Sequence, residues 1–198
     1  MNNVNTYANN KVILLNGPPG CGKDTLASAI AKAIPGVFVR EFKTRLYVIT
    51  DTVFGLTPMT TQVINMDRER KEVPMDIYGG RSCRQALIFV SEVVIKPNFG
   101  EDYFGRAAAA GIQPRELTVF SDSGFEDEAA CLIDKVGMNN IVLLRIRKRG
   151  DWGEDSRGYL PGDMLCNYLD INNNSTEDRF HLRALSLIAL FLAGAPTL

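Results

Sequence analysis

The sequence is poor in the residues on which several common chemistries depend. Its single histidine, His181, falls in the apolar closing segment, far from every other motif, which argues against catalysis by a Ser-His-Asp triad. The four cysteines are scattered without the paired spacing of a zinc site, so they are expected to be reduced thiols. A net charge of −1 argues against a nucleic-acid-binding surface spread over the whole protein.

Long apolar runs are also missing. The segment Leu182–Gly194 is too short to span a bilayer, and Arg183 interrupts it near its start. The first ten residues are polar and contain no apolar signal core. Together with the cysteines, these features predict a cytoplasmic protein without a membrane segment. With 198 residues and no internal repeat, the chain is expected to form one domain over residues 1–198, with residues 1–10 as a loose tail.

What the sequence does contain is a glycine-rich segment, GPPGCGKDT, at Gly17–Thr25. It follows an apolar run at Lys11–Leu15 that is typical of a buried strand, and it precedes an alanine-rich run at Leu26–Ile34 with helical spacing. Strand, glycine turn and helix in this order are the context of a phosphate-binding P-loop. The glycines let backbone N–H groups turn inward around an anion, and the helix start adds partial positive charge. The expected phosphate-binding residues are Gly17, Gly20, Cys21, Gly22, Lys23, Asp24 and Thr25.

Lys23 and Asp24 carry the charges of this loop. Lys23 can reach the outer phosphates of a nucleotide, so it is the first candidate for a catalytic residue. The usual pattern has Ser or Thr after the lysine to bind magnesium, whereas this chain has Asp24. A carboxylate can hold Mg²⁺ directly or through water, and both options stay open.

Apolar segments of four to six residues alternate with helical segments along nearly the whole chain. This alternation predicts an α/β protein of the three-layer P-loop NTPase fold, in which a parallel sheet has helices on both faces. Ligands of such sheets bind at the carboxyl ends of the strands. The P-loop, Asp122 and Arg145 each follow a predicted strand, so they are expected to converge on one crevice.

Asp122 follows the apolar segment Leu117–Phe120. A carboxylate at this position can hold Mg²⁺ opposite the P-loop, directly or through water. The alternative is a turn aspartate that caps the next helix, because short polar residues separate the predicted strand from that helix. Asp24 and Asp122 are therefore the candidate metal ligands.

The segment 145–162 is rich in arginine, glycine and aspartate and is predicted to be a long loop. Such a loop over the P-loop could act as a lid that stabilises the transferring phosphoryl group and excludes water. Arg145 and Arg157 are its candidate catalytic residues. The alternative is a solvated surface loop with ion pairs. The candidate hinges of the lid are Gly150, Gly153 and Gly158.

Basic residues at other loop ends are candidates for a second anion site. Arg81 and Arg84 open a predicted helix, and the forked guanidinium group suits bidentate binding of a monophosphate. Arg81 is the better placed of the two, and Lys43 and Arg45, which follow the second predicted strand, are the next candidates. For each of these residues the alternative is a solvated helix face.

Several segments resemble those of the phage-type deoxynucleoside monophosphate kinases, a branch of the P-loop kinases. GKDT at Gly22–Thr25 is similar to that family's form of the loop, aspartate included. RSCRQAL at Arg81–Leu87 and FGEDYFGRA at Phe99–Ala107 resemble two of its helices, and FSDSGFEDEAACL at Phe120–Leu132 resembles its segment with an aspartate and a later glutamate. The runs LLRIRKRG and EDSRGYLPG resemble its lid, and CNYLDINNNST resembles its closing strand and Asn-rich turn.

The resemblance implies a nucleoside monophosphate kinase-like fold with an Arg-rich lid, and transfer of the ATP γ-phosphate to a deoxynucleoside monophosphate (dNMP). It implies that ATP and Mg²⁺ are the cofactors, that Arg81 lies on the acceptor side and that Arg145 and Arg157 act in the lid. It implies no nucleic acid or membrane partner, and the host cytoplasm as the location if the chain is phage-encoded. A homodimer stays open.

Two other functions fit the same residues. Another small-molecule kinase, of the dephospho-coenzyme A or phosphomevalonate type, would share the P-loop and the lid. A nucleotide-sensing P-loop protein would bind ATP without transferring phosphate. The arginines outside the P-loop favour an enzyme, because nucleotide binding alone does not require a second anion site.

Overall fold

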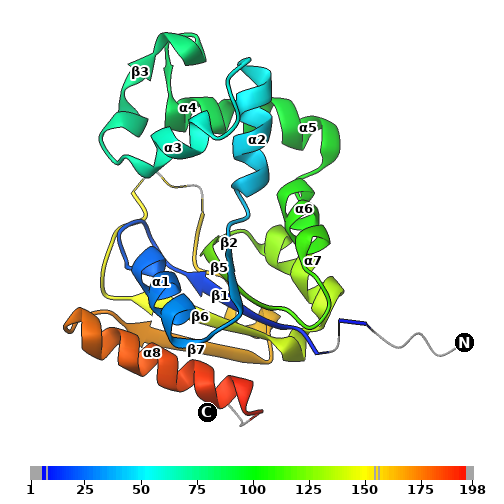
Figure 1. The fold of residues 1–198 in the computed structure, drawn as a ribbon, viewed down its shortest axis with the longest axis vertical. Coiled ribbons are helices and arrows are strands. Elements are labelled where there is room, and N and C mark those ends of the chain that lie inside the picture. Colours follow the sequence, from blue (N-terminus) through cyan, green and yellow to red (C-terminus); the bar gives the residue numbers. More distant parts are fainter. Residues whose placement is uncertain (1–5, 8, 154, 156, 195–198) are drawn as a thin grey trace, which may run out of the picture.

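The computed structural model describes residues 6–7, 9–153, 155 and 157–194. Its centre is a five-stranded parallel sheet in the order β2-β5-β1-β6-β7, which confirms the predicted α/β fold (Figure 1). The strands are β1 (Lys11–Asn16), β2 (Val37–Arg40), β5 (Leu117–Ser123), β6 (Ile141–Arg147) and β7 (Asn167–Asn172). β1 lies in the middle of the sheet, so the P-loop that follows it emerges at the centre of the carboxyl-end edge.

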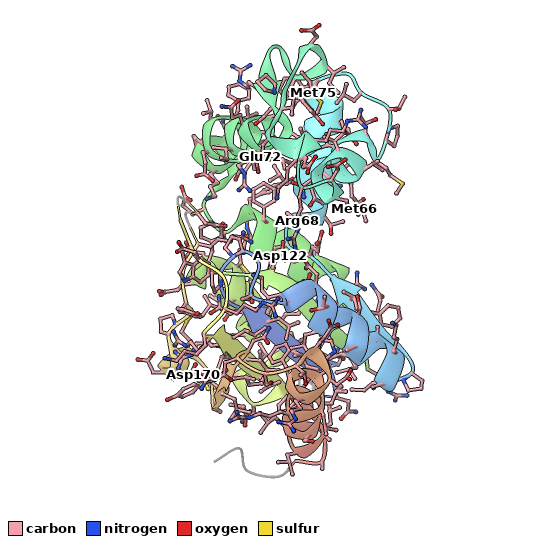
Figure 2. All side chains as sticks on the ribbon, turned by 90° about the vertical axis from the view of Figure 1, so that its left-hand side faces the viewer. Met66, Arg68, Glu72, Met75, Asp122 and Asp170 are labelled. Carbon is pink, nitrogen blue, oxygen red and sulfur yellow. The ribbon has the colours of Figure 1, made fainter. Side chains whose placement is uncertain are left out.

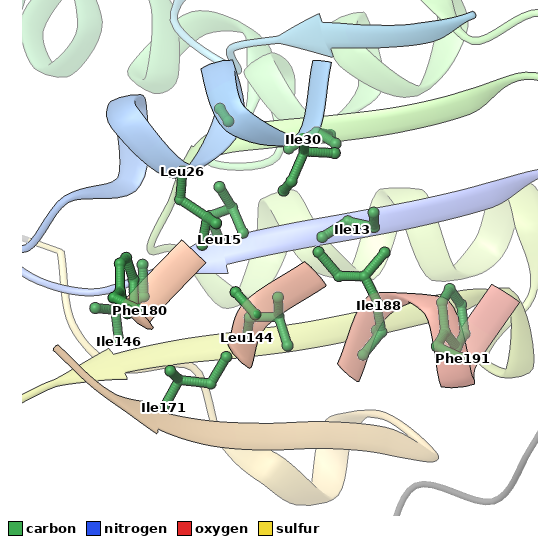
Figure 3. Close-up of a cluster of buried hydrophobic side chains, with 14 of the residues drawn as sticks. Ile13, Leu15, Leu26, Ile30, Leu144, Ile146, Ile171, Phe180, Ile188 and Phe191 are labelled. Carbon is green, nitrogen blue, oxygen red and sulfur yellow. The ribbon is translucent and has the colours of Figure 1, made fainter. Parts of the chain in front are cut away.

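One face of the sheet is covered by α1 (Lys23–Ala33) and α8 (Glu177–Leu192). Side chains of successive strand residues point to opposite faces, and Ile13 and Leu15 of β1 both pack into the core on this side (Figure 3). The helices contribute their own apolar stripes to the same core. α1 is therefore held against the sheet along its length, which fixes the orientation of its first turn behind the P-loop.

The opposite face is covered by α6 (Tyr103–Gly111) and α7 (Glu126–Val136). Val12 and Leu14, the intervening residues of β1, pack into this second core and are fully buried. Strands that are buried on both faces read as continuous apolar runs, which is why they can be found in the sequence. The three-layer arrangement predicted from the alternation of segments is thus present.

A helical module, residues 44–99, is inserted between β2 and the helix α6 that precedes β5. Figure 1 shows it above the sheet, on the side to which β2 leads. Its own core contains Tyr47, Ile64, Tyr78 and Leu87. Its elements are α2 (Thr44–Val53), α3 (Thr60–Met66), η1 (Arg70–Glu72), β3 (Pro74–Met75), η2 (Asp76–Tyr78), β4 (Arg81–Ser82), α4 (Cys83–Ile88), η3 (Phe89–Ile95) and α5 (Lys96–Phe99).

Several boundaries differ from those predicted. β5 continues to Ser123, so Asp122 lies inside the strand and not after it. β6 continues to Arg147, so the loop predicted over residues 145–162 begins at residue 148. Ser82 caps α4 as expected, through a capping box with Gln85, but the helix predicted to run to residue 95 changes to a π-helix, η3, at Phe89. The short pair β3–β4 carries no clear sequence signal.

Two short 3₁₀ turns complete the chain, η4 (Met138–Asn140) before β6 and η5 (Gly162–Met164) before β7. The predicted tail over residues 1–10 lies partly outside the described residues. Among the described residues, none of the helices combines the length and the apolar character needed to cross a membrane.

Candidate active site

The P-loop has the strand–turn–helix context that its sequence predicts. β1 ends at Asn16 and α1 begins at Lys23. Gly20 (φ 76°) and Gly22 (φ 100°) adopt left-handed backbone conformations that favour glycine. No side chain caps the first turn of α1, so its backbone N–H groups remain available to an anion. These features fit a nucleotide phosphate.

The ammonium group of Lys23 is held over this loop. Its Nζ donates to the carbonyl oxygens of Gly17 (2.5 Å) and Pro18 (2.9 Å), and the residue is 9% exposed. Burial lowers the pKa of Lys23, and the positive charge of Arg157 lowers it further, against the opposing effects of Cys21 and Asp24. Arg157 is therefore close enough to the P-loop lysine for the two charges to interact.

Two buried asparagines lie beside the P-loop, and neither was among the expected site residues. The Asn173 side chain donates to the carbonyl of Cys21 (2.9 Å), and a Cβ at Gly22 would lie only 2.9 Å from its Nδ2. Asn16 donates to the carbonyl of Ser123 (2.9 Å) at the end of β5. Gly22 is thus required both by its φ angle and by the closeness of Asn173.

Asp122 fixes the connection between β2 and α2. Its two carboxylate oxygens accept the backbone N–H groups of Phe42 (2.9 Å) and Lys43 (3.3 Å), and the side chain is buried. Burial lowers the pKa of Lys43, but the negative charges of Asp122 and Glu41, together with the Tyr47 hydroxyl, raise it above its ordinary value overall. Asp122 therefore fixes the backbone of Lys43 and stabilises its charge.

Arg157 lies between Asp122 and the P-loop. It forms a double ion pair with Asp155 (Nε–Oδ1 2.8 Å, Nη2–Oδ2 2.6 Å), and its Nη1 donates to the carbonyl of Asp122 (3.4 Å). The hydrogen bonds that it donates to Asp155 raise its pKa, and the nearby carboxyl groups of Asp122 and Glu128 add to this effect. The guanidinium group thus remains a fixed positive charge beside the end of β5.

Arg145, the other predicted lid arginine, has a different environment. Its guanidinium group pairs with Asp170 on β7 (Nε–Oδ1 2.7 Å) and lies 4.7 Å from the centre of the Tyr168 ring. Figure 2 shows Asp170 toward the opposite end of the molecule from the helical module, well away from Asp122. The backbone of Arg145 pairs with Asn16 in the sheet, but its guanidinium group is bound to Asp170 and to the carbonyl of Leu160 (3.2 Å) and contacts neither Lys23 nor Arg157 among the contacts of the described residues.

The two arms of the lid are held in different ways. Gly150 (φ 81°) packs against the P-loop, where an added Cβ would meet the carbonyl oxygen of Pro19 and lie 2.8 Å from the backbone nitrogen of Cys21. Gly158 is tied at both backbone groups, since its N–H donates to Gly124 (3.2 Å) and its carbonyl accepts from Asn16 (2.9 Å). A hinge at Gly158 is therefore not supported.

The helical module carries further cations, Arg84 and Lys71. Arg84 pairs with Glu72 (Nε–Oε1 2.8 Å), and the Lys71 ammonium is 4.0 Å from the same carboxylate. Burial lowers the pKa of Lys71, and the charges of Arg84 and Lys43 also lower it. The charge of Arg84 also acts on Asp155 in the lid. Arg84 and Lys71 therefore share the carboxylate of Glu72, and the charges of Lys43 and of the lid act on this group.

Arg81 and Arg45, by contrast, lie away from these groups. Arg81 is opposite Met75 in the β3–β4 pair and stacks on the Phe89 ring, 4.7 Å from its centre. Figure 2 shows Met75 at the far end of the helical module, whereas Glu72 and Arg68 lie nearer to Asp122. Arg45 is exposed on α2. The geometry thus favours Arg84 over Arg81 as the arginine of the second anion site.

Glu128 is a buried carboxyl group that was not among the expected site residues, although it is the later glutamate of the segment Phe120–Leu132. Burial and the charge of Asp122 raise its pKa to about 8, while Arg157 and Lys96 act in the opposite direction. Its burial could be expected from helical spacing in the sequence, because Glu128 shares the buried face of α7 with Leu132 and Val136. It places a second acidic group beside Asp122.

The described residues offer no protein-only metal centre. No group of three His, Cys, Asp or Glu side chains among them could hold a metal ion. Asp24 is exposed at the start of α1, next to the P-loop. Magnesium in phosphoryl-transfer enzymes is held largely by substrate phosphates and water, with one or two carboxylates, and the site fits that pattern.

No family model and no curated protein matches the sequence. Among solved structures, a gluconokinase from Sinorhizobium meliloti 1021 is 13% identical with a TM-score of 0.48, covering 93% of this chain and 92% of its own. A sugar kinase from Janibacter sp. HTCC2649 is 12% identical with a TM-score of 0.44, covering 95% and 99%. Shikimate kinase from Bacteroides thetaiotaomicron is 18% identical with a TM-score of 0.31, covering 93% and 83%. These likenesses are too distant to carry an argument about function.

Proposed function

We propose that the protein is a phosphotransferase that moves the γ-phosphate of ATP to a deoxynucleoside monophosphate, giving ADP and the deoxynucleoside diphosphate. The observation that supports the proposal is a second group of cations outside the P-loop. The P-loop with Lys23 is one site, and Lys43, Lys71 and Arg84 are the proposed second site; the charge of Arg157 acts on both Lys23 and Lys43, and its guanidinium group donates to the carbonyl of Asp122. A protein that only binds a nucleotide does not need the second site.

On the donor side, the uncapped first turn of α1 and the glycine turn offer backbone N–H groups to the phosphates of ATP. Lys23 at present donates to carbonyl oxygens of its own loop. We expect its ammonium group to exchange these bonds for bonds to the β- and γ-phosphates. Magnesium would neutralise phosphate charge, and Asp24, directly or through water, is the residue expected to hold it.

On the acceptor side, a monophosphate carries close to two negative charges at neutral pH and needs fixed donors to aim it. Arg84 is well suited to this role because its guanidinium fork allows two parallel bonds. Its ion pair with Glu72 is nearly half exposed, with side-chain exposures of 45% and 48%, so it contributes little to stability and can be exchanged for a phosphate. Lys71 and Lys43 supply further charge on the same side.

In the reaction, an oxygen of the acceptor phosphate attacks the γ-phosphorus as the bond to the β–γ bridging oxygen breaks, and ADP leaves with that oxygen. Negative charge spreads over the transferring group. Arg157 is the residue expected to stabilise it, because its guanidinium group is anchored by Asp155 and its charge acts on both Lys23 and Lys43. Arg145 is left with a structural ion pair to Asp170.

The motif resemblance supports a deoxynucleotide as acceptor, and a turnover panel tests it. Coupled ADP release should be measured with ATP, Mg²⁺ and each dNMP, NMP, phosphomevalonate and dephospho-coenzyme A. We expect stimulation by at least one dNMP well above the background ATP hydrolysis. Stimulation only by another acceptor would contradict the dNMP assignment and favour the corresponding small-molecule kinase. ATP binding without stimulation by any acceptor would favour a nucleotide sensor.

A further inference from the structure

The turn after β5 contains a glycine, Gly124, that lies directly against the side chain of Arg157. A Cβ added to Gly124 would lie 2.7 Å from the Cβ of Arg157 and 2.9 Å from its Cγ and Cδ. Contacts between real Cβ atoms and other heavy atoms are essentially never shorter than 3.0 Å. The aliphatic part of Arg157 therefore occupies the space that any other residue at position 124 would need.

The backbones on either side of this contact are tied together. The N–H group of Gly158 donates to the carbonyl of Gly124 (3.2 Å). The Asn16 side chain donates to the carbonyls of Ser123 and Gly158, both at 2.9 Å, and accepts the N–H group of Leu160 (2.9 Å). Asn16 is fully buried. The two segments cannot move apart without breaking buried hydrogen bonds, which is costly.

An alanine at position 124 could not be accommodated by a simple rotamer change. The closest atom is the Cβ of Arg157, whose position is fixed by the backbone of that residue. Gly124 is not among the residues with a positive φ, so the substitution itself introduces no left-handed strain. The expected effect of alanine is therefore displacement of the 157 backbone and, with it, of the guanidinium group.

We propose that Gly124 is a positioning residue, whose missing side chain lets Arg157 cross the end of β5 and place its guanidinium group against the Asp122 carbonyl. The inference rests on the proposed function for its catalytic consequence. It assigns Arg157 to the fixed base of the lid, where Asn16 holds the neighbouring Gly158 and Asp155 pairs with the guanidinium group, instead of to a part that closes over the substrate.

The test begins with Gly124→Ala and its matched control, Gly158→Ala. Gly158 is hydrogen-bonded to Gly124 through the backbone, but a Cβ added to Gly158 would meet nothing within 4 Å, and the φ of Gly158 is not positive. We expect Gly124→Ala to lower kcat on the order of tenfold to a hundredfold with little change in the ATP dissociation constant, because a displaced catalytic group affects the transition state most. Gly158→Ala should stay within about twofold of the parent in kcat.

A double-mutant cycle with Arg157→Gly then links the effect to the contact. Arg157→Gly removes the Cβ, Cγ and Cδ atoms together, whereas Arg157→Ala would keep the closest atom. In the Arg157→Gly background, Gly124→Ala should change the residual kcat by less than about twofold. An equal loss in both backgrounds, or parental kcat in Gly124→Ala alone, would overturn the proposal.

The free energies of unfolding of the parent, of the two single variants and of the double variant test the same contact independently of catalytic activity. We expect Gly124→Ala to destabilise the parent and to have little effect in Arg157→Gly. If Gly124→Ala alone does not fold, the double variant should fold, and failure of both would overturn the proposal. If the parent protein transfers phosphate to no acceptor, the proposed function fails, while non-additive unfolding energies would still support the assigned packing of Gly124 on Arg157.

Discussion

Replacement of Asp122 by asparagine tests how strongly this carboxylate holds the connection between β2 and α2. Its oxygens accept the backbone N–H groups of Phe42 (2.9 Å) and Lys43 (3.3 Å), and the residue is only 5% exposed. Asparagine keeps one acceptor oxygen but turns an NH₂ donor toward the other N–H group. One buried amide then loses its partner, which costs about 1–3 kcal/mol. We expect the free energy of unfolding of Asp122→Asn to fall by that amount.

Urea and thermal unfolding in the presence of EDTA measure this effect without magnesium. For a domain of this size, each kcal/mol lowers Tm by roughly 2–4 °C, so the expected decrease is roughly 2–12 °C. The matched control is Asp134→Asn, which neutralises an exposed aspartate in α7. Its free energy of unfolding should change by less than about 0.5 kcal/mol.

If Asp122→Asn unfolds like Asp134→Asn, the two backbone hydrogen bonds do not hold the β2–α2 connection and the reasoning is wrong. The magnesium dependence of ADP release is a separate readout. A higher magnesium requirement in Asp122→Asn would assign the carboxylate a metal role in addition to its structural one. An unchanged requirement, together with lower stability, would leave Asp122 as a structural anchor of Lys43.

Three further predictions address other groups. Lys23→Ala should lower kcat by orders of magnitude in a folded protein, and near-parental turnover would remove the P-loop assignment. Arg84→Ala should raise the KM for the acceptor about tenfold or more while the KM for ATP stays almost unchanged, whereas Arg81→Ala should alter neither; the reverse pattern would return the acceptor site to Arg81. The raised pKa of Glu128, about 8 against an ordinary 4.5, means that the folded state binds its proton more tightly. The free energy of unfolding in EDTA should therefore fall as pH rises from about 4.5 to 8, and Glu128→Gln should flatten this dependence; an unchanged slope would contradict the shift.

The P-loop and the parallel sheet could be predicted from sequence because both leave local signals. Glycines at fixed spacing beside Lys23 identify the loop, and strands buried on both faces are continuous apolar runs. The order of the strands and the long insertion between β2 and β5 have no comparable local signal. The helical module was expected only as separate helices, since its internal core arises from contacts distant in the chain.

The candidate site was harder to predict, because the direction of each side chain decides whether the residue contributes to it. Arg81 and Arg84 are three residues apart, yet Arg81 stacks on Phe89 while Arg84 pairs with Glu72 near the lid. Arg145 was expected in a loop, but β6 extends beyond it and pairs it with Asp170. Arg157 was expected in the lid, but its packing against Gly124 depends on a close approach between segments that the sequence does not reveal.

The central claim is that the protein transfers the γ-phosphoryl group of ATP to a deoxynucleoside monophosphate. Phosphorus NMR of the parent protein with ATP, Mg²⁺ and the preferred dNMP follows every phosphorus-containing species at once. We expect ADP and the deoxynucleoside diphosphate to form in equal amounts, with little inorganic phosphate, and Lys23→Ala to form neither at a comparable rate. ADP accompanied by inorganic phosphate alone, or no turnover with any dNMP, would contradict the account.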